Sequence, residues 1–282
     1  MKLLRYGDVG AEKPGLLDAD GNIRDMSAHT PDYAGETISQ SAIDAMRQID
    51  VNTLPIVQTS PRIGCCFASV PTFHCIGLNY TKHAEETGAQ KPSEPIIFSK
   101  ASSALSGPYD PVIQPKNSEK LDYEVELGIV IGKPAEYVSE ANALDYVVGY
   151  CLINDVSERE FQIERLGQWV KGKSARSFGP TGPWFVTADE IADPQALGCW
   201  LSVNGEMRQK SNTSDMIFSV KEIVSYMSRF MMLVPGDIIA TGTPEGVAMG
   251  MKPPAWLKPG DEIKLGIDGL GEQKQTVMAY PE

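Results

Sequence analysis

The most regular pattern in the sequence is the alternation of apolar and polar positions between residues 122 and 131. The apolar positions are Tyr123, Val125, Leu127, Ile129 and Ile131, and the positions between them include Asp122, Glu124, Glu126 and Gly128. Successive side chains of a β-strand point to opposite faces of the sheet. The segment therefore predicts a strand with one apolar face and one face that carries carboxylates.

Further short apolar runs predict additional strands. They cover residues 2–6, 73–77, 95–98 and 146–154. Asn204-Gly205 separates two strand-like segments and is typical of a type I′ hairpin turn. Two Pro-Gly-Asp triplets, at residues 235–237 and 259–261, each predict a turn that leads into a strand.

Few segments show helical spacing. Residues 39–50 place Ile43, Met46 and Ile49 on one helical face. Ser157-x-x-Glu160 and Ser219-x-x-Glu222 have the spacing of capping boxes, which predicts helices that extend to about residues 166 and 231. The apolar stripe of the second helix is typical of a helix that faces a core. The expected fold class is α+β, mostly β with scattered helices.

The order of these elements suggests two units. Residues 1–70 form a small N-terminal unit with a strand, a hairpin-like turn and one helix, and residues 71–282 form the main body.

The formal net charge of −12 makes nucleic acid and anionic membranes poor candidate partners. The longest apolar runs are too short to span a bilayer, and the N-terminal residues lack a signal-peptide pattern. We therefore expect a cytoplasmic protein that binds neither nucleic acid nor a membrane. An anionic substrate would require a local positive charge, from a metal or from a buried lysine.

The cysteine and histidine content restricts the kinds of metal site. The chain has five cysteines and three histidines, and no C-x-x-C pair. This excludes a disulfide framework, a zinc ribbon and a histidine-rich site. A metal would depend on carboxylates, which suit Mg²⁺, Mn²⁺ or Ca²⁺.

Glu124, Glu126 and Asp155 are the candidate metal ligands. Glu124 and Glu126 share one face of the predicted strand, and Asp155 ends the next long apolar run. The alternatives are a solvated strand face for the two glutamates and a helix N-cap for Asp155. Three carboxylates would leave positions of an octahedral Mg²⁺ open to water or to a chelating substrate.

Three other polar clusters are candidates for the site. His83 and Glu86 are three residues apart on a predicted helical turn, so that the carboxylate could orient the imidazole as a general base. An exposed pair on a solvated face is the alternative. Residues 169–176 place Lys171, Lys173 and Arg176 in a predicted loop, and the hydroxyls and backbone N–H groups of residues 241–246 could receive a carboxylate. Ordinary surface loops are the alternative for both.

Taken together, these segments resemble the fumarylacetoacetate hydrolase family, in the branch that acts on acylpyruvates and 2,4-diketo-3-deoxy sugar acids. The matching blocks are residues 76–86, 95–100, 123–128, 149–157, 173–174, 201–205 and 235–244. The resemblance implies a mixed β-roll catalytic domain, a homodimer, and Mg²⁺ or Mn²⁺ held by Glu124, Glu126 and Asp155. It also implies catalytic roles for His83, Glu86, Gln162 and Lys173, substrate contacts from Thr243, Gly242 and Lys173, and a lid from His83 to about Glu94.

The expected reaction is hydrolysis of the C3–C4 bond of a 2,4-diketo acid to pyruvate and a carboxylic acid, with a deoxy sugar acid as one candidate substrate. The same small 2-oxo acid chemistry would also support a hydratase, a decarboxylase, an isomerase or a ureidoglycolate lyase. A metal-stabilised binding protein without turnover is a further alternative, although it would need neither His83, Glu86 nor Lys173.

Overall fold

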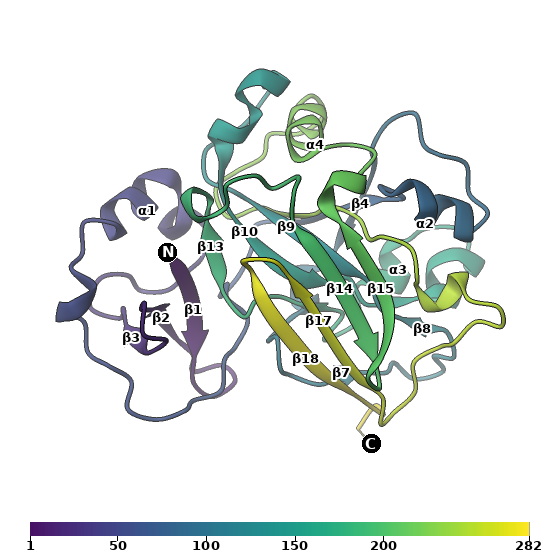
Figure 1. Ribbon diagram of the computed structural model, residues 1–282, viewed down its shortest axis with the longest axis horizontal. Helices are drawn as coiled ribbons and strands as arrows, with labels where there is room; N and C mark the ends of the chain where they lie inside the picture. Colours follow the sequence, from purple (N-terminus) through teal and green to yellow (C-terminus); the bar gives the residue numbers. More distant parts are fainter. Residues whose placement is uncertain (282) are drawn as a thin grey trace.

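The alternating segment lies at the centre of the larger of two β-sheets. The computed structural model describes residues 1–281. In it, β9 (Val125–Ile131) pairs antiparallel with β10 (Val147–Asn154), with Leu127 opposite Leu152 and Glu126 opposite Ile153. Neighbouring strands extend this sheet on both sides (Figure 1).

The larger sheet has nine strands, all antiparallel to their neighbours except β16 and β4, which run parallel. Across the sheet the order is β3 (Ile23–Asp25), β2 (Lys13–Leu17), β1 (Lys2–Tyr6), β13 (Phe185–Thr187), β10, β9, β16 (Ile238–Ala240), β4 (Phe73–Gly77) and β5 (Ile96–Lys100).

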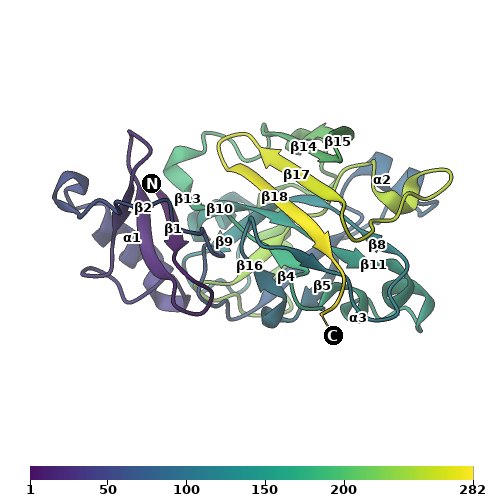
Figure 2. The ribbon, with the colours of Figure 1, turned by 90° about the horizontal axis from the view of Figure 1, so that it is seen from below.

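A second sheet of five strands covers one face of the first. Its order is β15 (Glu206–Asn212), β14 (Gly198–Val203), β17 (Glu262–Ile267), β18 (Gly271–Met278) and β7 (Val112–Ile113). β14 and β17 contact β9, and Figure 2 shows β17 and β18 as a separate layer over the central strands. Two short pairs complete the β structure: β8 (Leu121–Asp122) with β11 (Ser157–Glu158), and β6 (Leu105–Ser106) with β12 (Gly179–Pro180).

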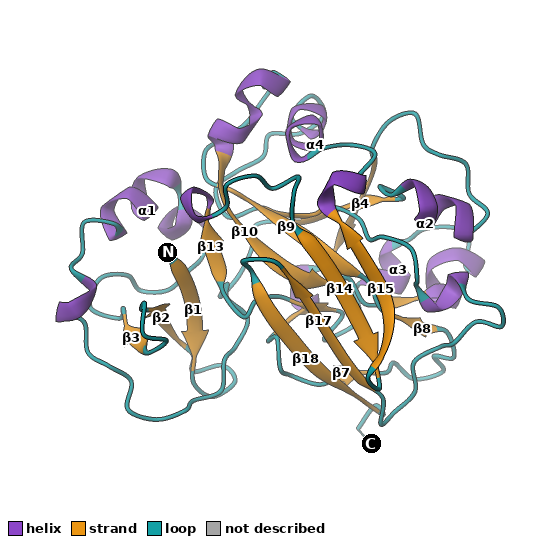
Figure 3. Ribbon diagram, viewed as in Figure 1, coloured by secondary structure: helices purple, strands orange, loops and turns teal. Residues whose placement is uncertain are grey.

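Helices are short and lie around the sheets (Figure 3). The α-helices are α1 (Gln40–Met46), α2 (Thr81–Glu86), α3 (Val170–Lys173) and α4 (Val220–Met227). A single π-helical turn spans Glu160–Glu164, and the 3₁₀ turns are Gly35–Ile38, Val51–Thr53, Ser102–Ala104, Glu140–Tyr146, Ala188–Glu190, Thr213–Asp215 and Ala248–Gly250. The predicted α+β class, mostly β with few helices, is confirmed.

The two faces of β9 belong to different hydrophobic cores. Val125, Leu127 and Ile129 pack in a core between the two sheets, together with residues of β14 and β17 such as Leu201 and Leu265. On the opposite face, Val130 packs with Cys151 and Ile153 of β10 and with side chains of the N-terminal unit. The alternation in the sequence is therefore an alternation between two cores, and both glutamates share the second face.

The N-terminal unit extends the larger sheet. β1 pairs antiparallel with β13 of the main body, so that the β1–β2–β3 meander continues from it at the left of Figure 1. α1 covers this part of the sheet, and its Ile43 and Met46 join the second core. The division of the chain at about residue 70 stays a prediction.

Several local predictions are confirmed. Asn204 and Gly205 have φ values of 52° and 80°, as a type I′ turn requires, and they join β14 to β15. The Ser219 hydroxyl accepts from the Glu222 N–H while the Glu222 carboxylate accepts from the Ser219 N–H, so that the predicted capping box opens α4. The stripe Val220, Ile223, Val224 and Met227 is buried.

Four local predictions need correction. The helix predicted from Ser219 to about residue 231 ends at Met227. Ser157 does not open a helix, because it pairs with Asp122 in the short β11–β8 ladder and its hydroxyl donates to the Asp155 carbonyl. The chain then forms the π-helical turn instead of an α-helix. The helix predicted for residues 39–50 ends at Met46. The predicted loop of residues 169–176 begins with α3, which ends at Lys173.

All five cysteines are free and buried, in agreement with the absence of a disulfide framework. Within residues 1–281, no helix is both long enough and apolar enough to cross a membrane.

The capping box of α4 gives a first test. Ser219→Ala should lower the free energy of unfolding by about 1 kcal/mol, because the first turn of the helix loses its side-chain acceptor. Urea denaturation measures this difference. Ser219→Thr, which keeps a hydroxyl, should lose less, and equal losses for the two variants would contradict the role of the cap.

Candidate metal centre and active site

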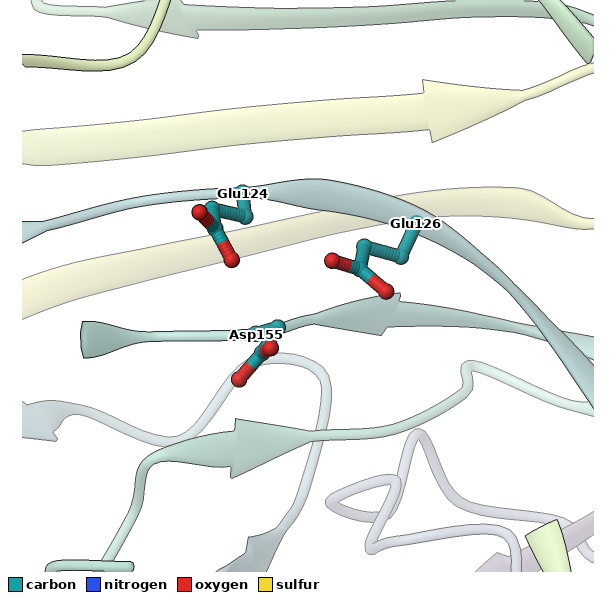
Figure 4. Close-up of side chains that lie close together, drawn as sticks. All are labelled: Glu124, Glu126 and Asp155. Carbon is teal, nitrogen blue, oxygen red and sulfur yellow. The ribbon is translucent and has the colours of Figure 1, made fainter. Parts of the chain in front are cut away.

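Glu124, Glu126 and Asp155 converge at the ends of the two central strands (Figure 4). Glu124 lies between β8 and β9, Glu126 is on β9, and Asp155 directly follows β10. The Asp155 N–H donates to the Glu124 carbonyl over 2.9 Å, which continues the β9–β10 pairing to this point. One carboxylate oxygen from each residue lies within 4.8 Å of the other two. The structure thus brings the three predicted ligands together.

The cluster is almost completely buried. The exposed fractions of Glu124, Glu126 and Asp155 are 4%, 3% and 0%. This excludes the solvated strand face that the sequence left open for the glutamates. Asp155 does not cap a helix either, because its carboxylate accepts from the ammonium groups of Lys100 and Lys173. Buried carboxylates are costly unless charges of opposite sign compensate them.

Three buried cations supply part of this compensation. The Lys173 Nζ donates to Glu124 Oε2 over 2.6 Å and to Asp155 Oδ2 over 2.7 Å. Arg159 Nη2 donates to Glu124 Oε1 over 2.6 Å. Lys100 Nζ donates to Asp155 Oδ1 and, over 3.1 Å, to the Val156 carbonyl. The cations come from three separate segments of the chain: α3, the start of the π-helical turn and β5.

These cations keep Glu124 ionised. Burial raises the pKa of the Glu124 carboxyl, but Arg159 and Lys173 outweigh burial and hold the pKa below its usual value. Burial lowers the pKa of the Lys173 ammonium, but the charges of Asp155 and Glu124 outweigh burial and hold the pKa above its usual value. Glu124 and Lys173 therefore face each other as charged groups.

Glu126 is the carboxylate whose charge is least compensated. Its Oε2 accepts from the Gly242 N–H over 2.8 Å, and it makes no ion pair with any residue in the described chain, 1–281. Burial and then the charges of Asp155 and Glu124 raise its pKa well above the usual value. A divalent cation among the three carboxylates would supply the missing charge. The oxygen donors present therefore fit a hard cation such as Mg²⁺ or Mn²⁺.

His83 and Glu86 form the predicted pair on α2. His83 Nδ1 lies 2.8 Å from Glu86 Oε1, and the other carboxylate oxygen accepts from the Gly246 N–H over 2.9 Å. His83 is only 4% exposed, which excludes the solvated pair. Because the Glu86 carboxylate can accept a hydrogen bond from Nδ1–H, a neutral imidazole in this tautomer has Nε2 free as a proton acceptor.

Gln162 lies within the π-helical turn, and it is 4% exposed. Its Oε1 accepts from Arg159 Nη1 over 2.9 Å, which leaves the amide Nε2 to donate to another group. Arg159 also donates from Nε to Asp122 Oδ2 over 2.8 Å. The arginine thus fixes Gln162 and Glu124 relative to each other.

Gly242 and Thr243 follow β16 and line the other side of the site. Besides holding Glu126, Gly242 has a φ of 96°, and a Cβ there would lie 2.7 Å from the Asn79 side chain. The Thr243 hydroxyl donates to the Val125 carbonyl over 3.0 Å and accepts from Gln209 Nε2 over 2.8 Å. In this structure Thr243 is thus tied to β9 and to Gln209.

Most of the side chains described above line one cavity with a volume of about 240 Å³. Of the predicted site residues, His83, Glu124, Glu126, Gln162, Lys173, Gly242 and Thr243 line it. Its remaining wall is mostly apolar and includes Ile76, Leu78, Phe98, Ile163, Trp169 and Met249. Gly77 makes this wall possible, because a Cβ there would lie 2.4 Å from the Trp169 ring.

Sequence reasoning did not assign roles to Arg159 and Lys100, which the structure brings to the site. Lys100 ends a strand whose other residues are apolar or small, and it is 3% exposed. Arg159 lies inside the segment that resembles a capping box, and this pattern concealed it. The available signal was the number of carboxylates on one buried strand face, which requires buried cations from elsewhere.

Comparison with known proteins identifies the family of this chain. Residues 72–278 match the family model for the C-terminal domain of fumarylacetoacetate (FAA) hydrolase. The chain is 56% identical to a Burkholderia multivorans protein provisionally named a hydrolase. The alignment spans 280 residues and covers 99% of each chain. The protein belongs to the fumarylacetoacetate hydrolase family.

Solved structures support the same assignment. The fumarylacetoacetate hydrolase of Exiguobacterium antarcticum is 35% identical, with a TM-score of 0.88 over 99% of this chain and 100% of that one. The maleylpyruvate hydrolase of Sphingobium sp. SYK-6, in complex with manganese(II) and pyruvate, is 30% identical, with a TM-score of 0.81 and full coverage of both chains. The similar structures also include isomerases, so the family context is that of hydrolases and isomerases.

The isolated position of Glu126 gives a second prediction. Glu126→Gln should abolish Mn²⁺ binding, measured by isothermal titration after EDTA treatment, because it removes one anionic ligand. The metal-free variant should unfold at or above the temperature of the metal-free parent, since the amide still accepts from Gly242 and the repulsion is removed.

Glu119→Gln, at an exposed glutamate, is the matched control and should bind Mn²⁺ like the parent. Unchanged Mn²⁺ affinity in Glu126→Gln would place the metal elsewhere.

Proposed function

We propose that this protein is a Mg²⁺- or Mn²⁺-dependent hydrolase that cleaves the C3–C4 bond of a 2,4-diketo acid to give pyruvate and a carboxylic acid. The observation that carries the proposal is that Glu124 and Glu126 of the buried carboxylate cluster line the same cavity as His83, which Glu86 holds. The carboxylates suit a hard cation, and the pair suits the activation of water.

Glu124, Glu126 and Asp155 would hold the cation, which would act as a Lewis acid toward the C1 carboxylate and C2 oxygen of the substrate and offset developing negative charge. The chain's own residues set the position of these ligands. Gly242 holds Glu126 through its N–H, Arg159 holds Glu124, and Lys100 holds Asp155. The ligand geometry is thus fixed before substrate binds.

His83 acts as the general base. Nε2 accepts a proton from water, whose oxygen bonds to C4 of the substrate. The Glu86 carboxylate, fixed by the Gly246 N–H, stabilises the imidazolium that forms. The C3–C4 bond then breaks with its electron pair moving to C3 and the adjacent C2 carbonyl, and C3 finally takes the proton held by the His83 imidazolium, which restores the base.

Lys173 and Gln162 act on the charge that develops at the C2 oxygen. Lys173 lines the cavity, and its raised pKa keeps it protonated. Gln162 can donate from Nε2, because Arg159 occupies its Oε1. Both donors are fixed by hydrogen bonds in a buried site, where such interactions are stronger than in water.

The apolar part of the cavity bears on the group attached at C4. Phe98 and Trp169 pack edge to face with ring centroids 5.2 Å apart, and Ile76 and Met249 line the same wall. Such a wall favours an alkyl or unsaturated acyl group over a polyhydroxylated one, because hydroxyl groups buried there would lack partners. We therefore place acylpyruvates before deoxy sugar acids among the candidate substrates.

An isomerase is the main alternative, and the isomerases among the similar structures favour it over a ureidoglycolate lyase, a hydratase or a decarboxylase. The same base could move a proton between two carbons without activating water. The proposal also includes a homodimer, as the family resemblance implies, which light scattering tests directly.

The reaction is tested in H₂¹⁸O with Mg²⁺ or Mn²⁺. Acetylpyruvate should give pyruvate and acetate with the label in the acetate, and a 2,4-diketo-3-deoxy sugar acid should react more slowly. An isomerase would leave the carbon skeleton intact and introduce no label. A hydratase would instead place the label at C4 of an intact product formed from 2-oxo-4-pentenoate. Release of glyoxylate and urea from ureidoglycolate alone would replace the hydrolase with the lyase.

The role of His83 gives a separate prediction. His83→Ala should lower kcat by about 10²–10⁴-fold, the usual range for a positioned general base, while Mn²⁺ binding persists. His29→Ala, at an exposed histidine, is the control and should keep full activity. Hydrolysis at the parental rate in the His83 variant would require another base.

A further inference from the structure

A second cavity lies at the seam between the N-terminal unit and the main body. Its volume is about 580 Å³, larger than that of the active site and within the usual range for small-molecule pockets. Arg5, Arg62 and Phe67 line it from the N-terminal side. The main body contributes two short segments, which contain Ser106 and Arg176. We call it the seam cavity.

Two of its three arginines are already neutralised. Arg62 donates to both oxygens of Asp110 over 2.7 and 2.5 Å, and also to Glu12 over 2.9 Å. Arg5 donates to both oxygens of Asp32 over 2.7 and 3.0 Å. Burial raises the pKa of Glu12, but Arg62 and Arg5 outweigh it and lower the pKa below its usual value, so that Glu12 stays ionised.

Arg176 differs from both. It is exposed, and it makes no ion pair or side-chain hydrogen bond with residues 1–281. Ser106 lines the same cavity, and its buried hydroxyl oxygen has no hydrogen-bond partner in the described chain. A guanidinium fork and a hydroxyl together suit a carboxylate.

The rest of the lining limits the ligand further. Phe67, Leu105 and Ile113 supply apolar surface, whereas the carboxylates of Glu12 and Asp110 are already paired with Arg62. A ligand with one carboxylate and an apolar body uses the free cation and the apolar wall. A second anionic group would find no free cation, because Arg5 and Arg62 already form ion pairs. On a chain with a net charge of −12, local cations of this kind are needed to attract any anion.

We propose that the seam cavity binds a small monocarboxylic acid, with its carboxylate on Arg176 and Ser106, and that its occupancy affects the active site. The route is short. Ser106 lies on β6 and Gly179 on β12, which pair in parallel with Leu105 opposite Gly179. β6 follows Lys100 after one 3₁₀ turn, and Arg176 follows Lys173 by three residues.

Lys100 and Lys173 both bind the Asp155 carboxylate. A further link joins the two segments, because the Ser174 hydroxyl accepts from the Ala101 N–H over 2.9 Å. A ligand that draws Ser106 and Arg176 together therefore acts on the two segments that position both lysines. Binding of the acid in the seam cavity does not depend on the proposed function, whereas its effect on turnover rests on that function.

Binding is tested by isothermal titration of the EDTA-treated protein with butyrate. Arg176→Ala should weaken butyrate binding by about tenfold or more, because a charged hydrogen-bonded pair is lost. Arg176→Lys should recover part of the affinity. Arg229→Ala is the matched control, since Arg229 also lacks an ion pair within the described residues and lies outside the cavity. Succinate and inorganic phosphate should bind more weakly than butyrate.

Equal butyrate affinity in the parent and in Arg176→Ala would overturn the site, and so would the absence of measurable butyrate binding to the parent. Tighter binding of phosphate or succinate would overturn the ligand class.

The coupling is tested in the hydrolase assay with and without saturating butyrate. The parent should show a change in kcat that Arg176→Ala lacks, because competition at the active site alters KM only. A butyrate effect of the same size in both proteins would assign it to the active site. If no acylpyruvate is turned over, the proposed function fails while the titration still decides whether the seam cavity binds butyrate.

Discussion

The burial of three like charges at the end of one strand pair is the constraint on which this structure depends. Glu124, Glu126 and Asp155 cannot all remain ionised without nearby cations, and the structure brings Lys100 and Lys173 to them from β5 and α3. These elements are far apart in the sequence. The carboxylate cluster thus organises the packing around it as well as the chemistry, because each cation fixes the segment that carries it.

The buried cations do not compensate all three carboxylates, and the uncompensated one is suited to binding a metal ion. Glu124 and Asp155 each accept from two cationic groups, whereas Glu126 accepts only from a backbone N–H. A fully neutralised cluster would gain little from a metal. One carboxylate without a cation keeps the site selective for an added positive charge, and the neighbouring ion pairs prevent the other ligands from moving away.

Much of the fold followed from local patterns. The alternation from Val125 to Ile131, the Asn204-Gly205 turn and the Ser219 capping box depend on residues close in sequence, and each is confirmed. Ser157 shows the limit of such reasoning. Its capping-box spacing is outweighed by pairing with Asp122, a residue on a distant segment that local sequence does not reveal.

In the candidate site, too, local spacing predicts some residues, whereas others depend on contacts between distant segments. The three carboxylates and the His83–Glu86 pair could be predicted, because strand and helix spacing place their side chains together. Arg159 could not, since its role depends on three acceptors, namely Asp122, Glu124 and Gln162, that meet only in the folded chain.

The proposed chemistry would allow one metal centre to serve both hydrolases and isomerases. A cation on the carboxylates, together with Lys173, would act at the 2-oxo acid end of a substrate, and neither would distinguish the two reactions. The distinction lies in what His83 reaches: water beside a carbonyl carbon, or a carbon-bound proton. In this chain His83 is held by Glu86 on its own helix, and Glu86 is held in turn by the Gly246 N–H on the loop after β16. We therefore expect the position of His83 relative to the apolar wall, and not the metal ligands, to decide which bond is broken.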